Sequence, residues 1–557
     1  MSHFCRTISS VKKKGGFTLI ELLIILGIVA ALFIVILIAV DPARRFAEAR
    51  NATRQQDTRS IEEAVLLYST DNKVLPTGID VTLRMLGTAT SSCGIICGGG
   101  DSASFFIDDT SAEFSAGTFS NTQYDSGNNW VELTPAGQIA GSGTYSSSIK
   151  DALSIVPWNT LSWLPQAPYG KELPNLLGAE VGYPQGNASM TNNVVLLHLN
   201  ELSGVAIADS SGEGNPGTAA GGVGLGASGK LRTALNFDGI NDRVVIANST
   251  DINSAGPYTN RTIALWFNAD TTTGRHVLYE EGAGVRGFNI YIDSGNVYVG
   301  GWNTAEYGWA GTWLSTTIAT STWYNVALRL KDGTAAVVAD KFKGFLNGVE
   351  FGSGSGGQLF THPGDVNIGR SNGASIYHNG ASSAAFYYDG RMDEFSMWNR
   401  GLAPTEILDV YKRGVLRLKY QVRSCDDLAC VGESFIGPDG GGSTFYTEAS
   451  STSLTIPAFP LTNVINNRYF QYQATLETDT SSLTPELTSV TINGELTSPS
   501  CLDLSPALVP DYLASIPQDP LTGNSQRTFY AIKQTSGERI YVNACSSELG
   551  QEIISQR

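Results

Sequence analysis

The chain has few charged residues and few histidines. Only 16% of its 557 residues are charged, five are histidines, and acids outnumber bases by 52 to 36, which gives a formal net charge of −16. A surface this acidic repels nucleic acid, so we expect no nucleic-acid partner. No H-E-x-x-H or E-x-D-x-x-E segment occurs. A glycosidase needs two carboxylates that face the same bond. The adjacent acids Glu280 with Glu281, and Asp393 with Glu394, would point to opposite faces of a strand, so we expect no enzyme.

Length and composition predict several domains that are rich in β-structure. A chain of 557 residues exceeds the size at which one hydrophobic core keeps growing. Its 61 glycines and many Ser and Thr residues favour short strands joined by turns. The N-terminus is the exception, because residues 22 to 40 contain no charged side chain. The predicted fold class is therefore α+β, with a long N-terminal helix followed by a mostly β chain.

The N-terminal apolar segment is long enough to span a membrane. About 20 apolar residues in a helix cover the roughly 30 Å hydrocarbon core, so residues 17 to 40 can cross a bilayer once, with the lysines at 12 to 14 on the cytoplasmic side. Glu21 lies inside this segment, where a carboxylate needs a partner or a function. If the chain is cut after Gly16, the new amine of Phe17 is such a partner.

The segment GGFTLIELL, which starts at Gly15, resembles the class III signal of type IV prepilins and of the pseudopilins of type II secretion. The resemblance implies a leader at 1–16, cleavage between Gly16 and Phe17 by a prepilin peptidase, and methylation of Phe17. It also implies that Glu21 neutralises the Phe17 amine of a neighbouring subunit during filament assembly. The protein would cross the inner or cytoplasmic membrane once, and then join an extracellular or periplasmic filament at the cell surface with other pilin subunits.

The filament helix is predicted over 17–72. Its second half carries apolar residues at helical spacing, which we interpret as the face that packs on the head. The arginines of this half alternate with acids, which predicts a solvated face. The apolar residues are Ile61, Ala64, Val65 and Tyr68, and the arginines are Arg44, Arg45, Arg50, Arg54 and Arg59.

Cleavage of the leader changes the cysteine count from seven to six. It removes Cys5 and four basic residues, Arg6 and the lysines at 12 to 14, so that the net charge becomes −16 − 4 = −20. Six cysteines pair evenly in an oxidising compartment, although free thiols and other connectivities remain open. Local spacing favours the pairs Cys93 with Cys97, Cys425 with Cys430, and Cys501 with Cys545.

The C-terminal residues contain two strand-like runs, TFYAIKQ and RIYVNAC, which predict a hairpin. The segment VPDYLASIPQDPLTG before them resembles the C-terminal part of small bacterial pilin heads, and Cys501 with Cys545 resembles their C-terminal disulfide. The resemblance implies a head split into 73–112 and 497–557, with everything between as an insertion. Domains tolerate insertion where the ends of an exposed loop lie close together.

Residues 183–413 contain short alternating strands separated by Gly, Asn and Asp, a pattern that predicts a sandwich or jelly roll. The segments ADSSGEGNPGTAAGG, ALNFDGINDRVVIANS and YDGRMDEFSMWNRGLAPTEILDVYKRG resemble the laminin G-like, concanavalin A-like superfamily. The resemblance implies a structural calcium ion held by Asp209, Asn215 and Asp393, because oxygen ligands suit calcium. In the alternative, Asp209 forms a turn and Asp393 a structural hydrogen bond.

An aromatic cluster in the jelly roll is a candidate ligand surface. Rings stack on sugar faces, although some of these side chains would instead point into the core. The cluster lies in the run WNTAEYGWAGTW and consists of Trp302, Tyr307, Trp309 and Trp313.

The segments 113–182 and 414–496 are both strand-like, and joined together they resemble one β-sandwich module of bacterial surface proteins. The predicted architecture is therefore nested, with a jelly roll inside a sandwich inside a pilin; a linear order of domains is the alternative. We expect a minor or tip filament subunit whose head binds a glycan or a host or matrix protein. The second hypothesis is a pseudopilin of a type II secretion or DNA-uptake machine with a purely structural head.

Overall fold

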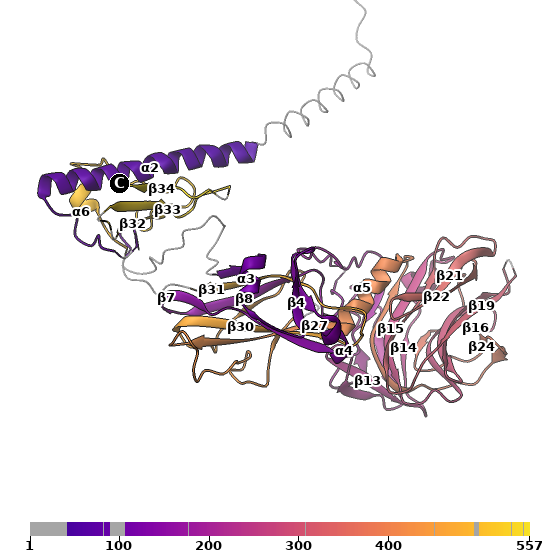
Figure 1. Ribbon diagram of the computed structural model, residues 1–557. Coiled ribbons are helices and arrows are strands. Elements are labelled where there is room, and N and C mark those ends of the chain that lie inside the picture. Colours follow the sequence, from indigo (N-terminus) through magenta and orange to yellow (C-terminus); the bar gives the residue numbers. More distant parts are fainter. Residues whose placement is uncertain are drawn as a thin grey trace, which may run out of the picture. The chain divides into compact units, whose positions relative to one another are not determined.

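The computed structural model (Figure 1) describes residues 42–81, 83–89, 106–176, 178–306, 308–449, 452–494, 501–535, 537, 539–549 and 551–557. The chain forms two compact units, Met1–Ser104 with Glu495–Arg557, and Phe105–Gly494. None of the described helices is both long and apolar enough to cross a bilayer. The predicted leader and span, with Gly15, Gly16, Phe17 and Glu21, lie outside the described residues, as do Cys93, Cys97 and Tyr307.

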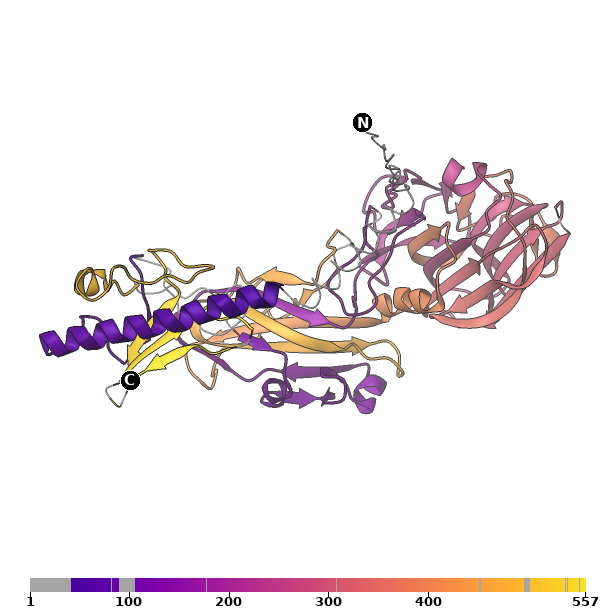
Figure 2. The ribbon, with the colours of Figure 1, turned by 90° about the horizontal axis from the view of Figure 1, so that it is seen from above.

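In the first unit, the helix α2 (Pro42–Asn72) packs on a four-stranded antiparallel sheet, three strands of which come from the other end of the chain. Pro42 starts the helix, and Lys73 ends it with a left-handed φ of 62°. The indigo helix and the yellow C-terminal strands lie side by side in both views (Figures 1 and 2). The sheet order is β1 (Arg84–Met85), β32 (Tyr530–Gln534), β33 (Ile540–Ala544) and β34 (Ile554–Gln556), and a short helix α6 covers Ser505–Leu508.

The apolar face predicted on α2 is confirmed. Ile61 and Val65 are fully buried, and they share one core with Ile532 and Val542 of the sheet. The hairpin predicted near the C-terminus is also present, with β32 and β33 antiparallel. Helix spacing and strand alternation were therefore sufficient to identify the two surfaces that meet in this unit.

The arginine face of α2 is only partly solvated, which corrects the expectation from charge alternation. Arg44 pairs with Glu48 on an exposed face, but the side chains of Arg54 and Asp519 are both fully buried. Arg54 Nε donates to Asp519 Oδ2 at 2.6 Å, and Arg54 Nη1 donates to Glu548 at 2.7 Å. Burial raises the pKa of Asp519, but its hydrogen bonds to Arg54 lower it overall, so the pair stays ionised. This ion pair clamps the helix to a loop of the C-terminal segment.

The loss of the buried cation is expected to destabilise this unit strongly. The substitution Arg54→Ala leaves the Asp519 carboxylate buried and without its cation, which should cost about 3 to 5 kcal/mol. The exposed pair gives the control, since Arg44→Ala should cost less than about 1 kcal/mol. Hydrogen exchange of the β33 amides reports the stability of this unit; equal protection in the two variants would contradict the assignment.

In the second unit, two six-stranded sheets each combine strands from before residue 166 and after residue 415. The long strand β30 pairs with β27 on one side and with β6 and β7 on the other. Trp163 stacks on Tyr420 between the sheets, with ring centroids 4.2 Å apart. One sheet contains β29 (Ala458–Pro460), β8 (Trp158–Pro165), β31 (Leu487–Gly494), β5 (Trp130–Leu133), β4 (Thr122–Asp125) and β2 (Phe106–Asp108). The other contains β28 (Tyr446–Thr447), β27 (Leu416–Cys425), β30 (Asn467–Thr478), β6 (Ser142–Ser146), β3 (Thr118–Ser120) and β7 (Lys150–Val156), and the helices α3 (Ser111–Ser115) and α4 (Pro135–Ala140) flank them.

Between these strands the chain forms a jelly roll of two eight-stranded antiparallel sheets. The first sheet contains β10 (Ala206–Ile207), β11 (Gly217–Ala220), β14 (Arg243–Ile246), β23 (Val366–Ile368), β16 (Arg275–Ala283), β17 (Arg286–Asp293), β18 (Asn296–Asn303) and β19 (Trp309–Thr317). The second contains β12 (Gly224–Ser228), β13 (Thr233–Asp238), β26 (Asp389–Trp398), β15 (Arg261–Ala269), β20 (Trp323–Leu330), β21 (Val338–Leu346), β22 (Val349–Gly356) and β9 (Asn193–Leu197). A π-helix η1 covers Thr250–Ser254, and β24 (Ser375–Tyr377) pairs with β25 (Gly380–Ser382) as a separate hairpin.

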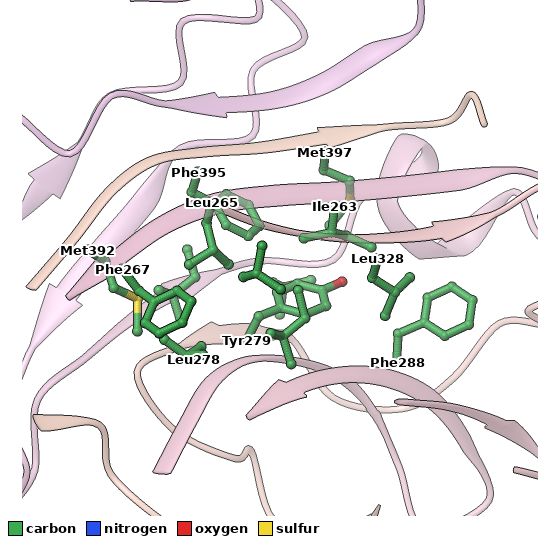
Figure 3. Close-up of a cluster of buried hydrophobic side chains, with 14 of the residues drawn as sticks. Ile263, Leu265, Phe267, Leu278, Tyr279, Phe288, Leu328, Met392, Phe395 and Met397 are labelled. Carbon is green, nitrogen blue, oxygen red and sulfur yellow. The ribbon is translucent and has the colours of Figure 1, made fainter. Parts of the chain in front are cut away.

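The core of the jelly roll lies between its two sheets. Large apolar side chains from both sheets interdigitate there, and almost every atom of them is removed from water (Figure 3). The labelled side chains come from β15 (Ile263, Leu265, Phe267), β16 (Leu278, Tyr279), β17 (Phe288), β20 (Leu328) and β26 (Met392, Phe395, Met397). The fold is thus mostly β, with a concanavalin-like jelly roll, as the strand pattern predicts.

The segment that enters the jelly roll is bound by the helix that leaves it. The helix α5 (Pro404–Val415) carries Arg413, whose side chain is 3% exposed. Arg413 donates to the backbone oxygens of Lys171 and Glu172, at 3.1 and 2.8 Å, and both of its terminal nitrogens donate to the carboxylate of Glu180 at 2.8 Å. Lys171 in turn pairs with Glu180 and with Glu448. Two buried cations therefore face two buried acids where the chain crosses between sandwich and jelly roll.

The disulfide predicted between Cys425 and Cys430 is present at the end of β27, with an S–S distance of 2.04 Å. Cys501 and Cys545 are each disulfide-bonded and lie in one buried cluster with Met85 and Ala531. The pairing of these two cysteines with each other stays a prediction, as do the domain boundaries.

Candidate functional site

A β-bulge determines where the acids of β26 lie. Trp266 of β15 is opposite Asp393 and Ala264 is opposite Ser396, so the single residue Leu265 faces both Glu394 and Phe395. Glu394 has a left-handed φ of 50°, which is rare for a residue with a side chain and is typical of such irregularities. The bulge interrupts the alternation of faces on which the sequence argument for Asp393 and Glu394 depended. Both side chains are buried.

Glu394 belongs to a buried cluster with His198 and Glu172, in which one ligand atom from each residue lies within 4.8 Å of the others. His198 contacts Glu394 through Nδ1, and its Nε2 lies 2.8 Å from Asn175 Oδ1. Glu172 accepts a hydrogen bond from Asn200 at 2.9 Å. Every member therefore has a protein partner, and we interpret the cluster as a hydrogen-bonded ion network. The sequence did not identify His198 or Glu172, because residues so far apart along the chain give no common spacing signal.

The side chains of Asp209 and Asn215, which are predicted to hold calcium, form hydrogen bonds mainly with backbone groups. Both oxygens of Asp209 accept hydrogen bonds: Oδ1 from the amides of Leu196 and Ser211, and Oδ2 from the Ser211 hydroxyl and the Asn215 amide, all at 2.8 to 3.0 Å. The side-chain amide of Asn215 donates to Val194 O at 2.8 Å. Asp209 thus fixes the loop between β10 and β11 against Leu196 of β9, which is the turn interpretation left open by the sequence.

Asp393 takes part in a different set of contacts. Its Oδ2 accepts hydrogen bonds from the amides of Lys230 and Leu231, at 2.7 and 2.8 Å. Burial, together with the charges of Glu394 and Glu172, raises the pKa of Asp393 well above its usual range. The oxygens of Asp209 already accept hydrogen bonds from N–H and O–H donors, whereas Asp393 Oδ1 is buried without a hydrogen-bond partner among the described residues. The contacts of Asp209 favour the turn interpretation, and the calcium ion stays a prediction.

On the turn interpretation, calcium is expected to leave the stability of the jelly roll unchanged. The melting temperature of the whole chain in detergent should differ by less than about 1 °C between millimolar calcium and a chelator, because both oxygens of Asp209 already have hydrogen-bond donors. The substitution Asp209→Asn should destabilise the domain by about 1 to 3 kcal/mol in both conditions, since an amide group replaces an acceptor of hydrogen bonds. A rise in melting temperature with calcium that Asp209→Asn abolishes would restore the calcium site.

The predicted aromatic surface is corrected for two of its residues. Trp302 is fully buried and donates from Nε1 to Ala283 O at 2.9 Å. Trp309 is 2% exposed and packs in the core against Phe288 and Phe342. Their rings cannot stack on a ligand, because both side chains are enclosed by protein. Trp313 is only partly buried.

Trp313 lies on the outer face of the first jelly-roll sheet, the face turned away from the core shown in Figure 3. On β17, Phe288, Ile290 and Ile292 point into the core, so Asn289 and Tyr291 must point outward. Cross-strand pairing aligns four outward residues in one line, which we call the polar row: Glu280, Asn289, Gly300 and Trp313. The alternation of apolar and polar residues in FNIYID indicates that Asn289 and Tyr291 share one face of a strand. The sequence alone does not show which strands lie beside it.

A small hairpin covers the polar row. We call the strands β24 and β25 the cover hairpin; β24 contacts β16 (Figure 1). Asn289 donates from Nδ2 to Ile376 O at 2.9 Å, and the His378 amide donates to the Tyr291 hydroxyl at 3.1 Å. The His378 ring stacks on Tyr298 with centroids 4.4 Å apart and an interplanar angle of 8°.

The adjacent acids Glu280 and Glu281 are fully buried in different surroundings. Glu280, in the polar row, accepts a hydrogen bond from the Asn372 amide at 3.0 Å, and burial raises its pKa to about 8. Glu281 points toward Arg261 and His362, at 3.8 and 3.4 Å. Burial raises the pKa of Glu281, but the charges of Arg261 and His362 lower it overall. Because the two carboxyl groups face opposite sides of the sheet, they cannot act together on one bond.

The neutral state of Glu280 makes the jelly roll less stable in base. Its folded pKa of about 8 exceeds the ordinary value of 4.5, so the contribution of the protonated carboxyl is fully present below about pH 4.5 and lost as the pH rises through 8. Glu280→Gln should remove this loss, which is on the order of a few kcal/mol. Hydrogen exchange of the β16 and β17 amides measures it, with the exposed Glu213→Gln as the control. Equal pH profiles for Glu280→Gln and the unmodified chain would refute the assignment.

Comparison with known proteins identifies the jelly roll. Residues 237–408 match the family described as the Concanavalin A-like lectin/glucanases superfamily, which confirms the predicted fold of this part. Among solved structures, domain 4 of a GH43 extracellular arabinanase from Geobacillus stearothermophilus, in complex with arabinotriose, is 18% identical, with 40% of this chain and 98% of that chain covered and a TM-score of 0.30.

Two toxin domains also show similarity. The binding domain of botulinum neurotoxin serotype G is 12% identical, with 42% of this chain and 57% of that chain covered and a TM-score of 0.31. The receptor binding domain of botulinum neurotoxin D is 11% identical, with 64% of this chain and 87% of that chain covered and a TM-score of 0.32. No curated protein matches the chain.

Proposed function

We propose that the protein is a type IV pilin-like filament subunit, minor or at the tip of the filament, that displays a binding head. The prepilin-type signal GGFTLIELL, from Gly15 to Leu23, carries the filament part of this proposal. The buried apolar face of α2 against the C-terminal sheet supports a split pilin head formed by 73–112 and 497–557. The proposed location is the inner or cytoplasmic membrane before assembly, and the cell surface or periplasm afterwards.

The head is proposed to bind a glycan or a host or matrix protein without turning it over. The match of residues 237–408 to a lectin and glucanase superfamily supports a binding role. Two features argue against catalysis. The carboxyls of Glu280 and Glu281 face different sides of a sheet, and Glu394 is engaged with His198. A head of this size is difficult to repeat at every position of a tight helical filament, which favours a minor or tip subunit.

A pseudopilin of a secretion or DNA-uptake machine is the second candidate. It uses the same N-terminal signal, so the signal does not separate the two functions. The binding of a ligand by intact filaments separates them, because a purely structural head predicts none.

Processing of the N-terminus tests the filament part directly. Co-expression with a prepilin peptidase should remove residues 1–16 and leave a methylated Phe17, which mass spectrometry of the N-terminal peptide detects. Gly16→Asp should block cleavage, because the charged side chain replaces the glycine at the expected cleavage position. Glu21→Ala should be cleaved normally, yet should lose most co-purification with other pilin subunits, because the Phe17 amine of the neighbour is left without a counter-charge.

Ser10→Ala, within the leader, is the matched control and should behave like the unmodified chain. A chain that keeps its leader in the presence of an active peptidase would eliminate both the pilus and the pseudopilin interpretations.

A further inference from the structure

The polar row contains hydrogen-bonding atoms that the protein buries without partners. These atoms are Glu280 Oε1, Asn289 Oδ1 and Trp313 Nε1. The side chains of Glu280 and Asn289 are fully buried. Leaving such an atom unpaired costs free energy, so a row of them on one face calls for an explanation. Neighbouring strands lie about 4.8 Å apart, and the three groups are therefore spaced along a line across the sheet.

Gly300 allows the side chains of Asn289 and Trp313 to pack directly over the backbone in the middle of this row. A Cβ atom at this position would lie 2.2 Å from Asn289 Oδ1 and 2.6 Å from Trp313 Nε1. The unpaired acceptor and the unpaired donor therefore converge on the place that any other residue would fill. Carboxyl, amide and indole groups arranged in this way can pair with a molecule that carries several hydroxyl groups.

An aromatic platform adjoins the row. Tyr291 and Tyr298 are cross-strand neighbours of β17 and β18, with parallel rings 4.9 Å apart. The exposed ring of His378 stacks on Tyr298, where a sugar ring would lie on an aromatic face. A saccharide is recognised by two features: groups that hydrogen-bond to its hydroxyls, and an aromatic ring on which the sugar ring stacks. Both occur here side by side.

The cover hairpin is built in a way that allows it to open. Each of its strands has three residues, and it joins neither sheet of the jelly roll. Gly373 before it and Gly380 within it have left-handed φ values of 92° and 120°, with open space around each. An isolated two-stranded hairpin is marginally stable, so its contacts with the sheet hold it closed. These contacts are the hydrogen bonds of Asn289 and Tyr291 and the buried ring of Tyr377, which packs on Tyr291.

We propose that the polar row and the ring of Tyr298 form a saccharide-binding site that the cover hairpin closes, and that a sugar takes the place of the His378 ring. The inference rests on the proposed binding function of the head and names the class of ligand and the place where it binds. The unpaired atoms of the polar row then form hydrogen bonds with hydroxyl groups of the sugar. The cover hairpin moves aside and takes the His378 ring with it.

A glycan-binding experiment with the whole chain in detergent tests the site. The probe is a printed array of plant, microbial and mammalian oligosaccharides, followed by titration with the best glycan found. Trp313→Ala should weaken binding at least about tenfold. His378→Ala should strengthen it several-fold, because the competing ring is gone. Trp323→Ala, a partly buried tryptophan on the opposite sheet, is the matched control and should leave the affinity unchanged.

Asn289→Ala should also weaken binding, provided that its circular dichroism and melting temperature match those of the unmodified chain. If it does not fold, Trp313→Ala and His378→Ala still decide the question, because their side chains are partly or fully exposed. Hydrogen exchange of residues 371–386 should increase when the glycan is added, as the hairpin leaves the sheet.

The outcomes separate this inference from the proposed function. A chain that binds a glycan with the same affinity after Trp313→Ala and His378→Ala has its site elsewhere, which overturns the inference and leaves the binding head intact. A chain that binds no glycan on the array overturns the inference, and binding of a matrix protein in the same format would then be the remaining form of the proposed function. Slower exchange of residues 371–386 with glycan would show that the hairpin closes on the ligand, contrary to the displacement proposed here.

Discussion

The arrangement of the second unit depends on the buried contact between Arg413 and the segment that enters the jelly roll. The guanidinium group of Arg413 forms a two-pronged pair with Glu180 and also holds two backbone oxygens of that segment. A charge taken out of water is tolerated only when its partners are complete, and here Lys171 and Glu448 complete the balance. The two ends of the inserted domain are therefore fixed together by a neutral group of four charges. The same backbone places Glu172 beside His198 and Glu394.

Buried charge recurs wherever elements distant along the chain meet. Arg54 and Asp519 join the helix of the first unit to its C-terminal segment, and Arg261 and His362 surround Glu281 inside the jelly roll. A chain with only 16% charged residues thus uses several of them as internal connections. Apolar contacts tolerate sliding, whereas a paired and desolvated charge fixes one position. In this protein, whose strands are rich in glycine and weakly charged, the buried ion pairs fix how the elements align.

Much of the fold follows from the sequence, and the limits of the prediction have physical causes. The spacing of Ile61 and Val65 identified the packed face of α2, and short alternating runs identified the jelly-roll strands. The burial of Arg54 could not be predicted, because its partner Asp519 is far away along the chain and no local pattern links them. The sequence placed Trp302 and Trp309 on a ligand surface, but whether a strand side chain is buried depends on its register with the neighbouring strands. The bulge at Glu394 has no signature in the residue types that form it.

The nesting of the strands also sets the order in which the chain can fold. Tyr145 on β6 pairs with Ala474 on β30, and the whole jelly roll lies between them in the sequence. As the chain emerges from its N-terminus, the first half of the sandwich has no partner strands and exposes its apolar faces. The jelly roll is self-contained and can form first, and its closure brings the two flanking segments together at Arg413. The long loop that separates β6 from β30 then becomes a short one, which lowers the entropy cost of pairing them. The inserted jelly roll thereby acts as the folding template for the sandwich that carries it.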